Sequence, residues 1–305
     1  MGAKLIKNLV KLAQYLNWKE FIVAFFIMSF ATSLPNLFVG IGSALRGIPQ
    51  LSFGDILGGD MVDLTLVMAL AVLFGKGSLA IESRMVQKSV IFTSLAAMLP
   101  LLLIFDGDLS RIDGIILLFA FLVYSFWLFS KADRFKKIYD ENENQANSIN
   151  FLGFLKILAN IIFLLAVLLL ASQAIIQSAQ VFSSQLHIPL ALIGLLIVGL
   201  GNAFPEAYLS IISSRKGENW LILGNLMGSV IVCSTLVLGT VALIAPIHIP
   251  DFSPFLIARI FTIITAFLFF VIARSGRKIT KKEALILIFI YISFLITEIF
   301  RPYFF

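Results

Sequence analysis

The chain has 305 residues, of which 60% are hydrophobic and only 13% are charged, and its net charge is +6. Soluble domains carry about 25% charged residues, so this composition argues against a soluble enzyme, and the apolar content excludes a disordered chain. The single cysteine, Cys233, excludes a secreted disulfide scaffold. Continuous apolar runs of about 20 residues indicate membrane-spanning helices, whereas a membrane β-barrel would alternate apolar and polar residues.

Nine apolar spans follow one another along the chain. They cover residues 19–46, 51–74, 86–105, 111–130, 152–172, 188–214, 220–245, 253–273 and 283–304. The polar stretch 131–150 divides them, so we expect an all-α polytopic membrane protein with a first membrane repeat over 1–130, a linker over 131–150 and a second repeat over 151–305. No signal peptide is expected ahead of the first span, because lysines interrupt the start of the chain.

The basic residues of the loops fall mainly on one side of the predicted membrane. Eighteen lie on the side of the N-terminus and the linker, and three, Arg46, Arg111 and Arg301, lie on the other. Cytoplasmic loops carry the excess of Lys and Arg, so the N-terminus and the linker 131–150 are predicted to be cytoplasmic. The positive charge therefore reflects topology, and we expect lipid but no nucleic acid as a partner. Frequent Lys, Asn, Ile and Phe suggest an AT-rich prokaryotic genome and hence the plasma membrane.

The chain contains an internal repeat. A shift of 170 residues places 32–67 on 202–237 without a gap, with eleven identities in 36 positions, among them Pro35 with Pro205. Five spans, an odd number, separate the two copies, so the copies are expected to cross the membrane in opposite senses. Inverted repeats of this kind, here of about five helices each, are typical of secondary transporters.

Each copy carries helix-breaking residues inside its spans. Pro35 and Pro205 lie mid-span, where proline removes a backbone hydrogen bond. Gly54 and Gly58, and at the matching places Gly224 and Gly228, lie near the start of the following span. Broken segments in matching places point to a transport site, and glycines four residues apart also favour close helix packing; both interpretations are kept.

Four acidic residues within the spans are taken as candidates: Asp55, Asp60, Asp63 and Glu206. A charge at the membrane centre costs about 2.5–3.5 kcal/mol on insertion scales, so such residues are candidates for function. No Lys or Arg is expected beside them, and Arg259, which could snorkel or form a pair, lies in another span. We therefore expect a cation from outside to bind Glu206 and Asp63. For Asp55 the sequence leaves open whether the side chain reaches the membrane interface.

Two pairs of segments carry a family resemblance. TSLPNLFVGIGSALRG and LSFGDILGGDMVDLTLV resemble the first signature repeat of the sodium/calcium exchangers, within the cation/Ca²⁺ antiporter superfamily. GNAFPEAYLSIISSRKG and LILGNLMGSVIVCSTLV resemble the second. The resemblance extends over nearly the whole chain and implies four helices around an ion site at the membrane midplane.

The resemblance also implies which residues form that site. The first repeat would contribute Thr32, Ser33, Asn36, Gly59, Asp60 and Asp63, and the second Asn202, Ala203, Glu206, Ser229 and Cys233. Three departures stand out: Asn36 replaces a family glutamate, Cys233 replaces an acid, and Gly59-Asp60 replaces Ser-Asn. Only Glu206 and Asp63 remain as matched acids. No resident cofactor is expected, because the transported cations are ligands and the two histidines lack zinc spacing.

From the sequence, no counterpart is expected here for the helix that opens the first repeat in the family. Residues 8–31 match 178–201, and the partner of 151–170 would precede Met1. Either the chain starts further upstream or the protein functions with nine spans.

The interpretation that follows is a secondary active cation antiporter, not an enzyme. It would exchange Ca²⁺, or another cation, against Na⁺ or H⁺ by alternating access. One alternative is a degenerate homologue that binds an ion without transport. A less favoured one is an intramembrane aspartyl protease, which would need aspartates on two helices, whereas Asp55, Asp60 and Asp63 share one span. The sequence leaves open the ions, their stoichiometry and the oligomeric state, a monomer included.

Overall fold

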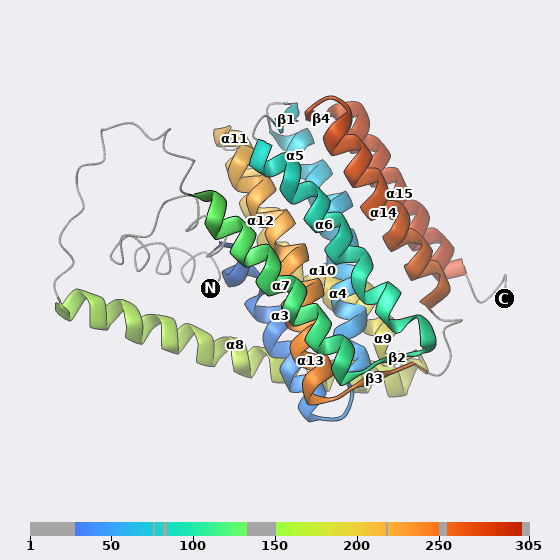
Figure 1. Ribbon diagram of the computed structural model, residues 1–305. Coiled ribbons are helices and arrows are strands. Elements are labelled where there is room, and N and C mark those ends of the chain that lie inside the picture. The colour runs from blue at the N-terminus through green and yellow to red at the C-terminus, as the bar shows by residue number, and fades with distance from the viewer. Residues whose placement is uncertain are drawn as a thin grey trace.

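The computed structural model describes residues 28–75, 77–81, 84–132, 151–217, 219–249 and 255–300. These residues form a helical bundle with two short two-stranded sheets (Figure 1). Eight helical segments are long and apolar enough to cross a membrane, as expected for an all-α polytopic membrane protein. They are Met28–Leu45, Gln50–Phe74, Val86–Asp106, Arg111–Ser130, Ile162–Leu186, Leu190–Lys216, Leu221–Ile244 and Leu256–Ser275.

The first half of the chain contributes five α-helices, one π-helical turn, one 3-10 turn and two strands. They are α3 (Met28–Leu45), α4 (Gln50–Val62), η2 (Asp63–Val67), α5 (Met68–Phe74), β1 (Ser78–Ala80), α6 (Arg84–Leu103), η3 (Ile104–Asp106), β2 (Asp108–Leu109) and α7 (Arg111–Ala132). The segments α4, η2 and α5 follow one another without a turn and form a single rod. Residues 19–27 of the first predicted span and nearly all of the predicted linker lie outside the described residues.

The second half begins with the longest helix and ends with a helical hairpin. Its elements are α8 (Phe151–Leu186), α9 (Leu190–Ile193), η4 (Gly194–Val198), α10 (Gly199–Asn202), α11 (Phe204–Lys216), α12 (Asn219–Ile231), η5 (Val232–Val237), α13 (Leu238–Ile244), β3 (Ile247–His248), α14 (Leu256–Ser275), β4 (Lys278–Thr280) and α15 (Lys281–Phe300). The last of these occupies the ninth predicted span and packs against α14 and α5.

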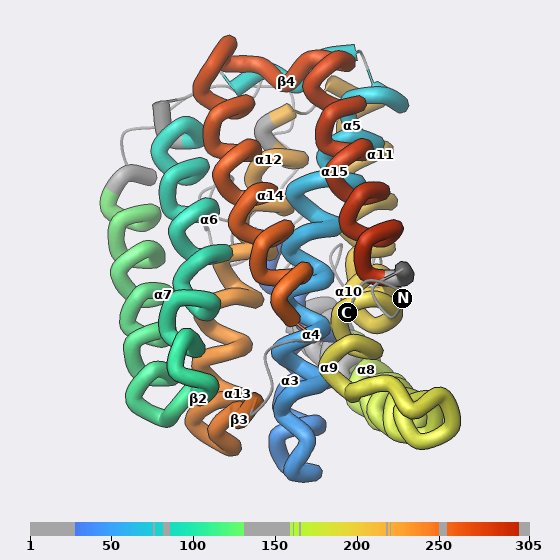
Figure 2. Tube along the Cα trace, turned by 90° about the vertical axis from the view of Figure 1, so that its right-hand side faces the viewer, coloured from blue at the N-terminus to red at the C-terminus, as the bar shows by residue number. Residues whose placement is uncertain are grey.

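One predicted span was too short. The span expected over 152–172 is part of α8, a helix of 36 residues whose membrane-crossing part is Ile162–Leu186. Residues 173–186 contain Gln and Ser but no charge, so the helix continues until His187, which has a positive φ of 54°, and Pro189. In Figure 1 the helix is steeply inclined to the others and projects from the lower end of the bundle on the left, and in Figure 2 it is seen almost end-on.

Two rods occupy the centre of the bundle. In the rod of α4, η2 and α5, 83% of the membrane-spanning stretch is buried inside the protein. In the rod of α12, η5 and α13 the buried share is 78%. The values for α7 and α8 are only 33% and 24%, and their exposed side chains include Phe119, Phe126 and Leu170. An apolar exposed surface is what lipid-facing helices need, so α7 and α8 form the periphery and the two rods form the core.

Both central rods contain a π-helical turn at the same relative place. These turns are η2 and η5, which coincide under the 170-residue shift except that η5 begins one residue earlier. The Thr65 hydroxyl donates a hydrogen bond to the Met61 carbonyl, and the Thr235 hydroxyl donates one to the Ile231 carbonyl at 2.5 Å. π-helical turns inside α-helices are rare and frequent at functional sites.

The sheets join the two halves at opposite ends of the bundle (Figure 1). Strand β1 of the first half pairs antiparallel with β4 of the second, with Leu79 opposite Ile279. Strand β2 pairs antiparallel with β3, with Leu109 opposite Ile247. In each sheet, the strand that follows a central rod (β1 or β3) pairs with a strand that connects two consecutive helices of the other half. These connecting strands are β4, between α14 and α15, and β2, between α6 and α7.

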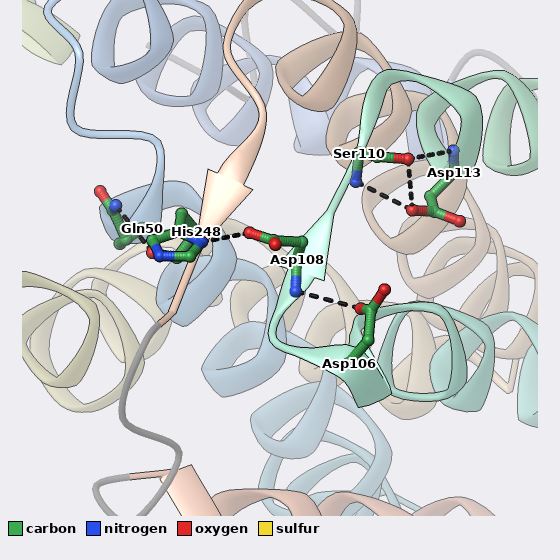
Figure 3. Close-up of polar contacts among 6 residues, drawn as sticks. All are labelled: Gln50, Asp106, Asp108, Ser110, Asp113 and His248. Carbon is green, nitrogen blue, oxygen red and sulfur yellow. Dashed lines mark hydrogen bonds and ion pairs between the residues drawn. The ribbon is translucent and has the colours of Figure 1, made fainter.

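The β2–β3 end is also held by side chains (Figure 3). His248 Nδ1 forms an ion pair with Asp108 Oδ1 across the sheet, and Gln50 Nε2 donates to the His248 carbonyl at 3.1 Å. Next along the chain, the Ser110 backbone N–H and hydroxyl both donate to Asp113, at 2.8 and 2.7 Å, in a capping box at the start of α7. The same arrangement recurs 170 residues later between Thr280 and Glu283.

Candidate functional site

Four acidic side chains are buried near the centre of the bundle. Asp55, Asp60 and Asp63 come from the α4–η2 rod and are 0%, 2% and 4% exposed. Glu206 comes from α11 and is 2% exposed. The sequence left the depth of Asp55 open, and the structure places it fully inside the protein.

A break in the helical chain positions Glu206. The segment α10 ends at Asn202, and α11 begins at Phe204 with Pro205 near its first position. Proline is tolerated there because the first N–H groups of a helix have no partner within the helix. Glu206 therefore lies in the first turn of α11, where the positive end of the helix dipole favours a carboxylate. In the first half, α3 continues through Pro35 without such a break.

A small cavity lies between the two halves at this level. The centre of a water-sized sphere can move within about 10 Å³ of this cavity, which is about the room needed by one buried water molecule. Its walls combine both halves of the chain. The lining residues are Asn36, Gly59, Asp60, Asp63, Asn202, Ala203, Glu206, Ser229 and Cys233.

The remaining predicted site residues, Thr32 and Ser33, lie behind this lining. The Ser33 and Ser229 hydroxyls are 3.3 Å apart and hydrogen-bonded, and Ser229 Oγ lies 3.3 Å from Glu206 Oε1, to which it can donate. The Thr32 hydroxyl donates to Asn225 Oδ1 at 3.3 Å. All the residues proposed from the sequence except Thr32 and Ser33 thus line the cavity, and Ser33 contacts its wall through Ser229.

The carboxylates differ in their hydrogen bonds. Asp60 Oδ2 accepts a hydrogen bond from the Ser234 hydroxyl on η5. Asp63 Oδ1 and Glu206 Oε2 are buried and have no hydrogen-bond partner in the described part of the structure. A buried polar atom without a partner costs about 1–3 kcal/mol, so these two oxygens indicate room for a proton or a cation.

None of the lining residues is basic. Arg259, the basic residue in another span, has its guanidinium over the ring of Phe105, 5.6 Å from the centroid and away from the cavity. Among the described residues, no three His, Cys, Asp or Glu side chains are already arranged as metal ligands. The acids surround the cavity without converging on one point, so an ion would have to draw them together.

Sequence reasoning left Asp55 out of the candidate site, and the structure shows what it contacts. Asn202 Nδ2 donates to both carboxylate oxygens of Asp55, at 3.0 and 3.1 Å. The 170-residue shift places Asp55 on Asn225 and Thr32 on Asn202, and Asn225 contacts Thr32 in the other half. Asp55 and Asn202 thus occupy the positions that correspond to Asn225 and Thr32 in the repeat. This correspondence is the signal in the sequence that could have placed Asp55 beside the site residue Asn202.

The contact between Asp55 and Asn202 gives a stability prediction. Asn202→Ala is expected to lower the free energy of unfolding by about 1–3 kcal/mol, because it leaves a buried carboxyl group without its donor. Asp55→Ala in the same background should then cost less than it does alone. Thermal unfolding of the two single variants and the double variant in detergent measures this coupling. Strictly additive losses would show that the two side chains do not interact.

Known proteins match the chain over most of its length. The family model described as sodium/calcium exchanger protein matches residues 1–130 and 156–300. Inner membrane protein YrbG of Escherichia coli is 26% identical over 74% of this chain and 70% of its own length. Sodium/calcium exchanger MaX1 of Methanosarcina acetivorans is 22% identical over 95% of this chain and 92% of its own.

Solved structures share the fold. The sodium-calcium exchanger NCX_Mj, in crystals soaked with Na⁺ and Ca²⁺, superposes with a TM-score of 0.68 over 97% of this chain and 93% of its own, at 20% identity. This likeness shows that the chain has the exchanger fold. The family model, which covers most of the chain, and the membrane-crossing helices identify an integral membrane protein of a cation antiporter family, which is a family of transporters and not of enzymes. The chain belongs to the sodium/calcium exchanger family.

Proposed function

We propose that this protein exchanges Ca²⁺ for Na⁺ or H⁺ across the plasma membrane, at the cavity between its two halves. The observation that carries the proposal is the pair of buried, unpartnered oxygens, Asp63 Oδ1 and Glu206 Oε2, in a cavity lined by no basic side chain. Two desolvated carboxyl groups need neutralisation by protons or by a cation. A divalent cation or two monovalent ions would supply the same charge, and this equivalence is the basis of exchange.

The donor set suits a hard cation. Calcium takes six to eight oxygen ligands from carboxylates, carbonyls, amides and water. Besides Asp63 and Glu206, the lining offers Asp60, the amides of Asn36 and Asn202 and the Ser229 hydroxyl. Asp60 brings a third carboxyl group to the cavity, which offsets the loss of family acids at Asn36 and Cys233.

Competition for the same carboxylates would couple the two ions. When Ca²⁺ occupies Asp63 and Glu206, no counter-ion can bind there, and the protein reorients with one cargo at a time. The relatives support this proposal in their names: MaX1 is called a sodium/calcium exchanger, and a relative from Alkalimonas amylolytica, 27% identical over 77% of this chain, is called the putative antiporter CaxA.

The proposal is tested by ion uptake into proteoliposomes that contain the purified protein. Vesicles are loaded with Na⁺, or given an inside-acid pH gradient, and uptake of Ca²⁺ is followed beside Mg²⁺, Mn²⁺ and K⁺. We expect Ca²⁺ uptake driven by at least one of the two gradients and none without a gradient. Folded protein that moves no cation under either gradient would contradict antiport and favour a homologue that binds ions without transport.

A further inference from the structure

The cavity contains a sulfur atom. Cys233 lies in η5, is 3% exposed and lines the cavity together with Asp60, Asp63 and Glu206. It is the only cysteine of the chain. Most buried cysteines act as small apolar side chains, so the thiol alone does not define a site.

The unpartnered carboxylate oxygens distinguish this cysteine from a core residue. Asp63 Oδ1 and Glu206 Oε2 are buried at the same cavity and have no hydrogen-bond partner in the described structure. They come from η2 and α11, while Cys233 comes from η5, so three separate segments present donors to one space. Asp60 is tied to this wall as well, because it accepts a hydrogen bond from Ser234, the residue after Cys233.

We propose that this cavity binds thiophilic divalent cations, of which Cd²⁺ and Zn²⁺ are examples, with the Cys233 sulfur and the carboxylates of Asp63 and Glu206 as ligands. The inference rests on the proposed cation site and specifies its chemical preference. Thiolate ligands favour softer metals, whereas carboxylates and carbonyls alone favour Ca²⁺ and Mg²⁺. An oxygen-only lining would lack this preference.

The binding step releases protons and forms only metal–ligand bonds. The sulfur–metal bond forms as the Cys233 S–H bond gives up its proton to water, and any proton held by Asp63 or Glu206 leaves to water in the same way, since thiolate and carboxylate are the forms that bind metals. No oxidant or reductant is involved. The ligands surround the cavity at present and must close on the ion, so the soft cation would hold the two halves together and compete with the transported cation.

A direct binding experiment tests the sulfur ligand. Cd²⁺ is titrated into the purified full-length protein, and the cadmium–thiolate charge-transfer absorption in the near ultraviolet is recorded. We expect saturable absorption that is absent in Cys233→Ser and requires at least about tenfold more Cd²⁺ in Glu206→Gln and in Asp63→Asn. A matched control moves the thiol: Cys233→Ser with Ala97→Cys places a buried cysteine on α6, outside the cavity lining, and should show no absorption.

A transport experiment with the same variants separates this inference from the proposed function. Cd²⁺ should inhibit Ca²⁺ uptake by the natural chain, and the ratio of Cd²⁺ to Ca²⁺ apparent affinity should fall at least about tenfold in Cys233→Ser. Absorption without any uptake would overturn the antiport proposal and leave the thiol site standing. Intact uptake with no absorption, or absorption unchanged in Glu206→Gln and Asp63→Asn, would overturn the inference.

Discussion

Gly58→Ala is expected to disrupt the protein severely. Among the glycines near the site, only Gly54 leaves less room for a methyl group. A Cβ at Gly58 would lie 2.0 Å from the carbonyl oxygen of Leu195, and one at Gly54 would lie 1.8 Å from that of Ala191. The obstructing atoms are backbone, so no rotamer change can remove the clash. Overpacking costs about 1–3 kcal/mol when side chains can adjust, and here we expect at least the upper value.

The reason is the close approach of two helices from different halves. Gly54 and Gly58 of α4 meet the segment of α9, η4 and α10, and that segment contributes two glycines of its own. A Cβ on Gly194 would lie 2.3 Å from the Leu51 carbonyl oxygen, and one on Gly199 would lie 2.7 Å from that of Asp55. The same contact sets Asp55 against Asn202, so separating the helices also opens the wall of the cavity.

Thermal unfolding in detergent and Ca²⁺ uptake together measure the effect of Gly58→Ala. We expect a lower midpoint and loss of uptake at temperatures where the unchanged protein is active. Gly201→Ala is the matched control, because Gly201 lies in α10 with nothing within 4 Å of the position that a Cβ would take, and the variant should gain helix propensity. Equal behaviour of the two variants would show that the backbone contact does not hold the halves together.

The second large effect is expected from Glu206→Gln. The substitution keeps the shape of the side chain and an oxygen that can accept the hydrogen bond from Ser229. It removes the negative charge that would bind the cation at the start of α11. Loss of outer-shell partners alone lowers metal affinity about 10–100-fold, so loss of this ligand should lower the apparent affinity for Ca²⁺ by about a hundredfold or more. Gradient-driven uptake in proteoliposomes over a range of Ca²⁺ concentrations measures the change.

Glu283→Gln is the control for this experiment. Glu283 accepts hydrogen bonds from Thr280 at the start of α15 and lies outside the cavity lining. Its loss should cost about 1 kcal/mol of stability, as for other helix caps, and should leave the apparent affinity for Ca²⁺ unchanged. If Glu206→Gln behaved like Glu283→Gln, the cation would not be bound by Glu206.

The membrane-crossing helices could be predicted from the sequence, because each follows from the length of a continuous apolar stretch. Eight of the nine predicted spans overlap helices of membrane-crossing length, and the expected site residues other than Thr32 and Ser33 line one cavity. The extent of α8 was underestimated because its second half is uncharged but not strongly apolar. The two sheets are only two or three residues per strand, which is too short for a period-2 pattern to be detected.

The role of Asp55 could not be predicted from its own position. A carboxylate five residues into a span lies at a depth where either the interface or the interior is reasonable. Its burial follows from Gly54 and Gly58, which let α4 pack directly against α9 and η4, and from Gly199 of α10, which lies against the Asp55 backbone. The Asn202 amide then replaces water as the hydrogen-bond donor to Asp55. The π-helical turns likewise depend on tertiary packing, because neither η2 nor η5 contains Gly or Pro to mark a change of helical pitch.

The π-helical turns have a consequence for the history of the chain. A π-helical turn corresponds to one extra residue in a helix, and both halves contain it at matching positions with the same threonine-to-carbonyl hydrogen bond. Two independent insertions at matching places are a less economical explanation than one. The extra residue would then date from a half-length ancestor, before gene duplication and fusion produced the present chain.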